Sequence, residues 1–246
     1  MLDAFKRLIG RGTGPGWNAV SQWALDHRLT FKRESEGEGF VIEGMADKRP
    51  WRLEWGPPQR LYIPGRELRL RIELGLSPNL QLLLLSQPLL EQLEGQMYER
   101  FTETTQTMID GATPEEMRWL AMFPKINYKA DKAVRMRFGL VGSPTDAAAA
   151  WVEGPLVARL EEASNGLLKA EPAFLMMVLR GRLYLRMEMP DPDVAAISQV
   201  ISLFETAAQQ ALKLAVSDEG EGGWSSSGSS AWQNQIDNAA GKRGGG

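Results

Sequence analysis

The sequence predicts an α+β fold. We expect an antiparallel sheet meander with flanking helices, followed by a second, smaller unit of helix, strand hairpin and long helix. Three observations support this class. Between residues 29 and 85, short segments that alternate apolar and charged residues follow one another closely. Tight turns separate them, as at Pro64-Gly65, where proline fixes φ and glycine accepts a positive φ. After residue 88 the apolar residues recur at helical spacing.

Composition places the chain among ordinary globular proteins. Of its 246 residues, 43% are hydrophobic and 24% are charged, and the length fits one large domain or two small ones. There is no cysteine, so disulfides, thiolate metal sites and cysteine nucleophiles are excluded. The net charge is −3, and residues 217–246 hold four acidic and two basic residues, which leaves −1 on the body. A body this close to neutral attracts no polyanion at long range, so nucleic-acid binding is not expected.

The N-terminal segment and the longest apolar run indicate where in the cell the protein is expected. Residues 1–14 are predicted to be flexible or a short amphipathic N-terminus, with Leu2, Phe5 and Leu8 among its apolar residues. This stretch is too short and too interrupted for a signal-peptide core. The richest apolar run, residues 80–85, is far below the ~20 residues of a transmembrane helix. We therefore expect a cytoplasmic protein without a transmembrane segment.

The first predicted unit spans residues 15–112. Its strands follow one another with short turns, which is typical of an antiparallel meander. Its last helix is indicated by apolar residues every fourth position from Leu89 to Phe101. We expect a helix at 15–27, strands at 29–33, 40–45, 51–55, 60–63, 67–74 and 80–85, and a helix at 89–101.

The segment RELRLRIEL, residues 66–74, has one apolar and one charged face. Antiparallel sheets commonly have one solvated face, and alternating arginine and glutamate are typical of it. We interpret the charged face as the salt-bridged outer side of the sheet, with a binding surface as the alternative. The charged face carries Glu67, Arg69, Arg71 and Glu73.

The second predicted unit spans residues 113–216. A helix begins at Thr113, which is expected to cap it while Glu116 reaches back to the Thr113 amide. We then expect a strand at 134–141, a helical region at 145–163 interrupted at 154–155, and a hairpin of 174–179 with 182–189. The longest helix follows, with Asp191 as its cap.

Two alternatives concern this unit. The apolar stripe of the long helix suits packing on the hairpin sheet, and a coiled-coil homodimer is the other interpretation. ADKAVRMRFG at 130–139 echoes ADKRPWRLEWG at 46–56, and LYLRMEM at 183–189 echoes LRLRIEL at 68–74. These echoes are compatible with a duplicated α/β unit, although alternating strands also resemble one another by chance.

The element order of this second unit, helix, strands, helix, strand hairpin and long helix, resembles that of type III secretion chaperone-like folds. The resemblance covers about half of the chain and rests on element order alone. It implies binding of a partner by the sheet, and dimerisation.

The tail, residues 217–246, is dominated by glycine, serine and polar residues. Such a composition cannot bury enough apolar area to offset the entropy of ordering, so we expect disorder. Trp224 and Trp232 stand out in it. They are candidates for a short motif that docks on a partner, and the alternative is that they cover a nearby groove or have no role.

Recognisable catalytic and cofactor motifs are absent from the sequence. His27 is the single histidine, and no serine lies in a nucleophile-elbow motif. One histidine without cysteine leaves zinc and iron without their usual ligands, and no phosphate-binding glycine loop is present. We therefore expect no cofactor and no metal. Carboxylates near 99–110 are a weaker candidate for catalysis, and a solvated helix end explains them as well.

Arginine and aromatic residues gather on adjacent hairpins of the first predicted sheet. These residue types are enriched at interface hot spots, so they form a candidate protein-binding patch unless the tryptophans point into the core. The patch consists of Arg52, Trp55, Tyr62, Arg69 and Arg71.

These patterns favour a non-catalytic intracellular protein-interaction module of chaperone or adaptor type, with a protein partner. The first alternative is an enzyme with a carboxylate-based cleft between the two units. The second is a peripheral membrane-associated protein anchored by residues 1–14.

Overall fold

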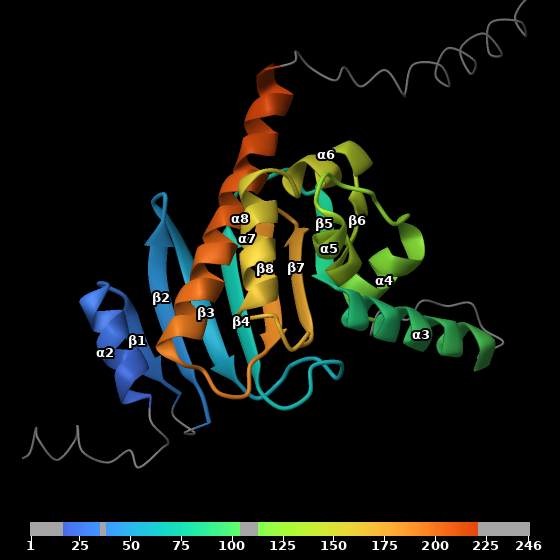
Figure 1. Cartoon of the computed structure of the whole chain (residues 1–246). Coiled ribbons are helices and arrows are strands. Elements are labelled where there is room, and N and C mark those ends of the chain that lie inside the picture. The colour runs from blue at the N-terminus through green and yellow to red at the C-terminus, as the bar shows by residue number, and fades with distance from the viewer. Residues whose placement is uncertain (1–16, 35–37, 104–112, 221–246) are drawn as a thin grey trace, which may run out of the picture.

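An eight-stranded antiparallel sheet organises the chain, with long helices lying across one of its faces (Figure 1). The computed structural model describes residues 17–34, 38–103 and 113–220. The predicted α+β class with antiparallel pairing is confirmed. The strands are β1 (Thr30–Arg33), β2 (Phe40–Ala46), β3 (Arg49–Gly56), β4 (Glu67–Glu73), β5 (Gln81–Ser86), β6 (Phe138–Ser143), β7 (Phe174–Leu179) and β8 (Arg182–Glu188). The helices are α2 (Asn18–Asp26), α3 (Gln87–Glu103), α4 (Glu115–Met122), α5 (Lys132–Arg137), α6 (Thr145–Trp151), α7 (Pro155–Asn165) and α8 (Val194–Gly220).

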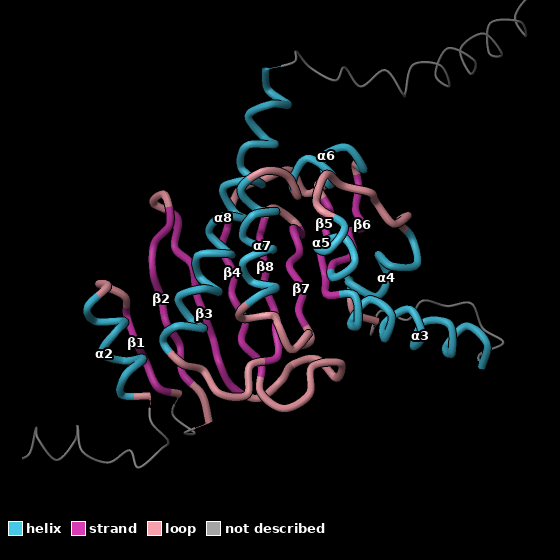
Figure 2. Tube along the Cα trace, viewed as in Figure 1, coloured by secondary structure: helices cyan, strands magenta, loops and turns pink. Residues whose placement is uncertain are grey.

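The strand order joins both predicted units in one sheet, β1-β2-β3-β4-β8-β7-β5-β6 (Figure 2). The first four strands form the expected meander. β4 then pairs with β8, so the echoing segments 68–74 and 183–189 are direct neighbours, with Leu70 opposite Leu185. β5 lies between β7 and β6, away from β4, its predecessor in the sequence.

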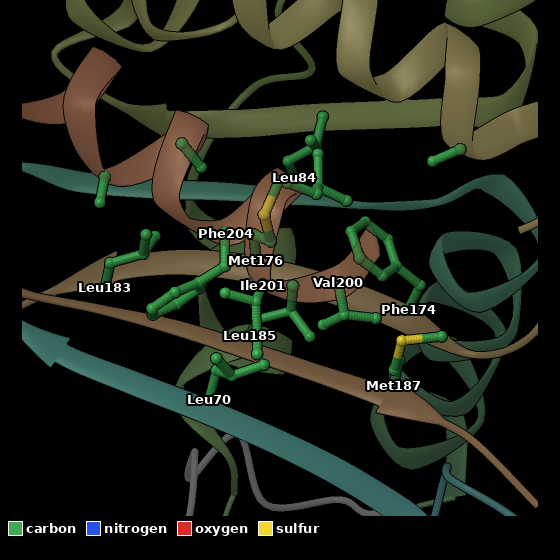
Figure 3. Packing of buried hydrophobic residues seen from close by; sticks show 14 of the residues in the cluster. Leu70, Leu84, Phe174, Met176, Leu183, Leu185, Met187, Val200, Ile201 and Phe204 are labelled. Atoms are coloured by element: carbon green, nitrogen blue, oxygen red, sulfur yellow. The ribbon is translucent and has the colours of Figure 1, made fainter. Parts of the chain in front are cut away.

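The larger core lies between the sheet and the helices α2, α6, α7 and α8. Apolar side chains at alternate strand positions point to this face, because successive residues of a strand project to opposite sides. Val200 and Phe204 of α8 are fully buried against Leu70 and Leu185 of the central strands (Figure 3). The apolar stripe of α8 is thus used within the chain, as the packing interpretation predicts.

A smaller core lies on the opposite face, and only at one end of the sheet. There β5 and β7 present apolar residues to both faces, and α3 and α4 cover the second one. The covered side chains of these strands are Leu83, Leu85, Leu175 and Met177.

One predicted strand is wrong, and another is right only in its second half. Residues 60–63 form turns, because β2 and β4 already occupy both sides of β3, and Tyr62 and Ile63 pack into the smaller core instead. Residues 134–141 are helix α5 followed by β6. In α5 only Val134 is buried, and Met136, predicted to lie on a strand, is exposed. The echo between 130–139 and 46–56 therefore does not extend to the structure.

Two predicted helix caps also differ. The N-cap of α4 is Pro114 with no side-chain hydrogen bond, so the Thr113–Glu116 capping box does not form, and Glu116 is buried elsewhere. At α8 the side chain of Asp193, in place of Asp191, accepts a hydrogen bond from the Ala196 amide at 2.7 Å.

Helix α8 continues through Gly220, beyond the predicted start of the tail at residue 217. Trp224 and Trp232 lie outside the described residues, as do residues 1–14, so the predictions about both segments stay predictions. Among the described helices, none combines the length and the apolar character that a membrane span requires.

Candidate functional site

The uncovered part of the second sheet face is the candidate site, and we call it the bare face. It consists of the side chains that β1, β2, β3, β4 and β8 project away from α7 and α8. Because the pairing is in register, these side chains form rows across the sheet. One row is Thr30, Glu43, Arg52, Arg71 and Tyr184, and the next is Lys32, Val41, Glu54, Arg69 and Arg186.

Arginines lie directly opposite one another at two places in these rows. Arg52 faces Arg71 across β3 and β4, and Arg69 faces Arg186 across β4 and β8. Like charges in directly opposite positions destabilise a sheet, so each such pair calls for carboxylates between or beside the guanidinium groups.

Glutamates supply that compensation for three of the four arginines. Arg52 contacts Glu43 at 2.8 Å and Glu54 at 2.5 Å. Arg69 contacts Glu54 at 3.3 Å and Glu67 at 3.4 Å. Glu67 also accepts a hydrogen bond from Arg186 at 2.5 Å. Arg71 is exposed and has no ion pair or hydrogen bond from its side chain within the described residues.

The arginines shift the pKa of two of these carboxyl groups. The hydrogen bond from Lys32, aided by Arg52, lowers the pKa of Glu43. Partial burial by itself raises the pKa of Glu54, but the hydrogen bond and charge of Arg52 outweigh it and lower the pKa. Both groups are therefore held as carboxylates by the bare face.

A groove of about 760 Å³ lies where the strands of the bare face end beside the turn between α2 and β1. Four arginines and two glutamates line it. Besides Arg71, it contains Arg28, which is exposed and has no side-chain partner in the described part of the chain. The other charged lining residues are Arg52, Arg182, Glu43 and Glu73. Apolar and neutral lining residues include His27, Leu29, Thr30, Met45, Pro50, Trp51 and Ile72.

Two buried glutamates mark the boundary between the bare face and the smaller core. Glu67 is fully buried and accepts from the backbone amide of Gln59 at 2.6 Å, in addition to its two arginines. Glu116 of α4 is 1% exposed and accepts hydrogen bonds from Arg60 at 2.7 Å and from the Tyr62 hydroxyl. Burial, with the Glu116 carboxylate, raises the pKa of Tyr62, so its hydroxyl stays protonated and donates. These contacts hold the 57–66 loop against α4 and β4.

The predicted binding patch is divided by the structure. Arg52 and Arg71 line the groove, whereas Arg69 is only 13% exposed and lies within the ion-pair network. Trp55 is buried and donates from its indole nitrogen to the Met189 carbonyl oxygen at 2.7 Å, and Tyr62 is buried beside Glu116. An exposed patch can therefore include Arg52 and Arg71 but not the two aromatic rings.

The sequence does not indicate Arg28 as a site residue. It directly follows the single histidine, at a positive φ of 57°, and only the packing of α2 beside β1 brings it to the groove. His27 itself contacts the Trp23 carbonyl oxygen through Nδ1 at 2.8 Å, one helical turn earlier. Within the described residues, no group of three histidine, aspartate or glutamate side chains is placed to hold a metal ion.

Comparison with known proteins adds one likeness in fold. No protein-family model matches the chain, and no curated protein matches it. The structure is similar to the crystal structure of the mycobacterial trehalose monomycolate transport factor A, TtfA, with a TM-score of 0.47 and 12% sequence identity. The likeness covers 80% of this chain and 93% of that chain. At this level it says nothing about what the present chain binds.

Proposed function

We propose that this chain is a non-catalytic, cytoplasmic protein-interaction module of adaptor or chaperone type, which binds a protein partner on its bare face. The observation that carries the proposal is the unequal covering of one sheet face. Helices α3 and α4 cover its apolar end. No described helix covers the end formed by β1 to β4 and β8, where the row through Thr30, Arg52 and Arg71 is accessible. An open sheet face with a groove at its end is a surface on which a partner can lie.

The chemistry of this face supports recognition of a protein. Arginine is enriched in protein interfaces because its guanidinium group forms several directed hydrogen bonds at once. Most arginines of the bare face are already oriented by glutamates, so binding need not order them first. Met45, which is 62% exposed, and the exposed Pro50 add apolar surface beside these charges.

Position-specific photo-crosslinking in the native cell tests the proposal. A photoreactive amino acid is placed at Thr30 or Tyr184 on the bare face, and at Gln209 on the exposed side of α8 as a matched control. We expect a protein adduct of one defined mass from Thr30 and Tyr184 and none from Gln209.

Two outcomes would overturn this proposal. Adducts of equal yield from all three positions would mean that the bare face is not distinguished from the rest of the surface. Turnover of a small-molecule substrate by the purified chain, without any adduct, would favour the enzyme alternative. An adduct of twice the chain mass would identify a second copy as the partner and would support the homodimer that the sequence leaves open.

A further inference from the structure

Within the described residues, the groove at the end of the bare face is lined by four arginines and only two glutamates. We infer that it receives an extended acidic segment of the partner, whose carboxylates are bound by Arg28 and Arg71. This inference rests on the proposed function and states which part of a partner the bare face recognises.

Among the described residues, two of the four arginines in the groove form ion pairs with glutamates, and two do not. Arg52 is bound by Glu43 and Glu54, and Arg182 donates to Glu73 at 2.5 Å. Arg28 and Arg71 form no ion pair with a carboxylate among the described residues, although they line the same groove and the charge of Arg71 acts on Glu54.

Arg71 also lies directly opposite Arg52, whose guanidinium group repels it, while the charge of Glu54 attracts it. An incoming carboxylate removes this repulsion and forms a paired, charge-assisted contact with a guanidinium group. The arrangement therefore favours binding of an anionic group over the empty state.

The dimensions of the groove fit an extended chain. Its lining takes residues from five neighbouring strands, β1, β2, β3, β4 and β8. At ~4.8 Å between strands, the groove crosses roughly 19 Å of sheet, which about six residues of extended chain span. Arg28 precedes β1 and Arg71 lies on β4, three strands away, or roughly 14 Å. Acidic residues about four positions apart would meet both arginines from the same side of an extended segment.

The walls of the groove favour a peptide over a bare phosphate or a lipid surface. Met45 and Pro50 are exposed apolar residues between the charged ones, and Leu29 and Trp51 also line the groove. A peptide can place apolar side chains on these walls, and a methionine adapts its shape to them. The glutamates Glu43 and Glu73 in the same groove oppose a uniformly anionic membrane surface.

A defined peptide tests the inference with the full chain. The probe is a fluorescein-labelled eight-residue peptide with two glutamates four positions apart among leucine, alanine and serine, and its counterpart has glutamine at both positions. Fluorescence anisotropy gives the affinity at low and at physiological salt. We expect the acidic peptide to bind and the glutamine peptide to bind at least roughly tenfold more weakly, because charge-assisted hydrogen bonds are lost.

Variants then locate the binding. Arg28→Gln and Arg71→Gln should each weaken the acidic peptide at least roughly tenfold, and Arg71→Lys should weaken it less, because lysine keeps the charge but loses the paired geometry. The control Arg135→Gln with Arg159→Gln removes two exposed arginines outside the groove, and should change the affinity less than roughly twofold. Thermal unfolding of Arg28→Gln and Arg71→Gln should stay close to that of the wild type, since neither arginine forms an ion pair among the described residues. The control loses only the exposed ion pair of Arg159 with Glu162, which contributes ~0–1 kcal/mol.

Four outcomes would overturn the inference: no binding of the acidic peptide, equal binding of the glutamine peptide, equal loss in the control variant, or phosphatidylserine vesicles that bind and are not displaced by the peptide. The two proposals fail separately. Adducts from Tyr184, which lies on the bare face outside the groove lining, that persist in Arg71→Gln would leave the interaction module standing without this groove. Peptide binding without any cellular adduct would keep the acidic-segment site and reject the module.

Discussion

The two ends of one sheet face differ in almost every property except their backbone. At the β5–β7 end, Leu83 and Met177 are buried beneath α3 and α4. At the β3–β4 end, Arg52 and Arg71 continue the same row of opposite residues across the sheet, but Arg52 is half-exposed and Arg71 is exposed. The difference shows that pairing alone does not decide whether a face is covered. Side chains decide it, since apolar area contributes about 25 cal/mol per Å² when buried, and exposed ion pairs contribute ~0–1 kcal/mol each.

The division has a consequence for function. A surface that contributes little to the free energy of unfolding can change its residues without unfolding the protein. The covered end therefore contributes most of this face's share of the free energy of unfolding. The bare end can accept substitutions that adapt it to a partner.

The largest effect is expected at the boundary between the two ends. Glu67→Ala removes a fully buried carboxylate and leaves Arg186 and Arg69, 16% and 13% exposed, without their shared partner. Breaking a buried ion pair in this way costs about 3–5 kcal/mol of unfolding free energy. Urea denaturation measures it, with Glu73→Ala as the control because the Glu73 side chain is 53% exposed. Equal losses for the two variants would mean that no buried boundary separates the ends.

The second-largest loss of stability is expected when a buried side chain at the covered end is shortened. Leu83→Ala creates a cavity between β5 and the helices α3 and α4, at a fully buried position. Such substitutions cost roughly 2–5 kcal/mol. Differential scanning calorimetry should show a clearly lower Tm. A loss below about 0.5 kcal/mol would show that α3 and α4 do not hold this end closed.

Within the bare face, Arg69 and Arg71 of β4 should differ in their contribution to stability. Arg69→Gln removes a largely covered guanidinium from two carboxylates and should cost about 1–3 kcal/mol. Arg71→Gln removes an exposed guanidinium that forms no ion pair among the described residues, and should change the free energy of unfolding by no more than about 0.5 kcal/mol. Urea denaturation of the two single variants measures the difference. If both changes proved neutral, RELRLRIEL would present a uniformly solvated face, as the sequence alone suggests.

The smallest effect concerns pH. Arg52 holds the pKa of Glu54 below its ordinary value of 4.5 in the folded protein. The stabilisation is therefore complete above pH 4.5 and is lost as the pH falls through the lowered folded value. Glu54→Gln should be less stable than the wild type at pH 7, by at most about 1 kcal/mol, and equal to it at low pH. Unfolding curves at several pH values measure the difference in stability between the wild type and Glu54→Gln. A difference that grows toward low pH would contradict the prediction.

Much of the fold follows from local patterns. The alternation in RELRLRIEL indicates a strand with one wet face, and the continuous apolar runs of β5 and β7 match strands that are buried on both faces. The Arg180-Gly181 turn, with positive φ at both residues, forms as expected between β7 and β8. In contrast, 60–63 and 134–137 carry a strand-like alternation and are not strands. Residues 60–63 follow β3, whose two sides are occupied by β2 and β4, and residues 134–137 precede Phe138, the residue opposite the last residue of β5, Ser86.

The candidate site is predictable only in part. Arg52 and Arg71 follow from alternation, which puts them on the charged side of their strands. Trp55 lies on the same strand as Arg52, but its side chain projects to the opposite face, and its ring is buried in the core. Glu116 matches a capping-box pattern and instead binds Arg60 and Tyr62, because the half-buried guanidinium and the buried hydroxyl offer it stronger partners than a helix end in water.

Local patterns are sufficient to predict the α+β class, most strand and helix positions and the charged side of the central strands, because these depend on the period of apolar residues along a short stretch of chain. They do not predict that β4 pairs with β8, that α3 and α4 cover one end of the second face, or that Arg28 joins Arg71 in one groove. Those features depend on contacts between residues far apart in the chain, and many strand orders satisfy the same local pattern equally well.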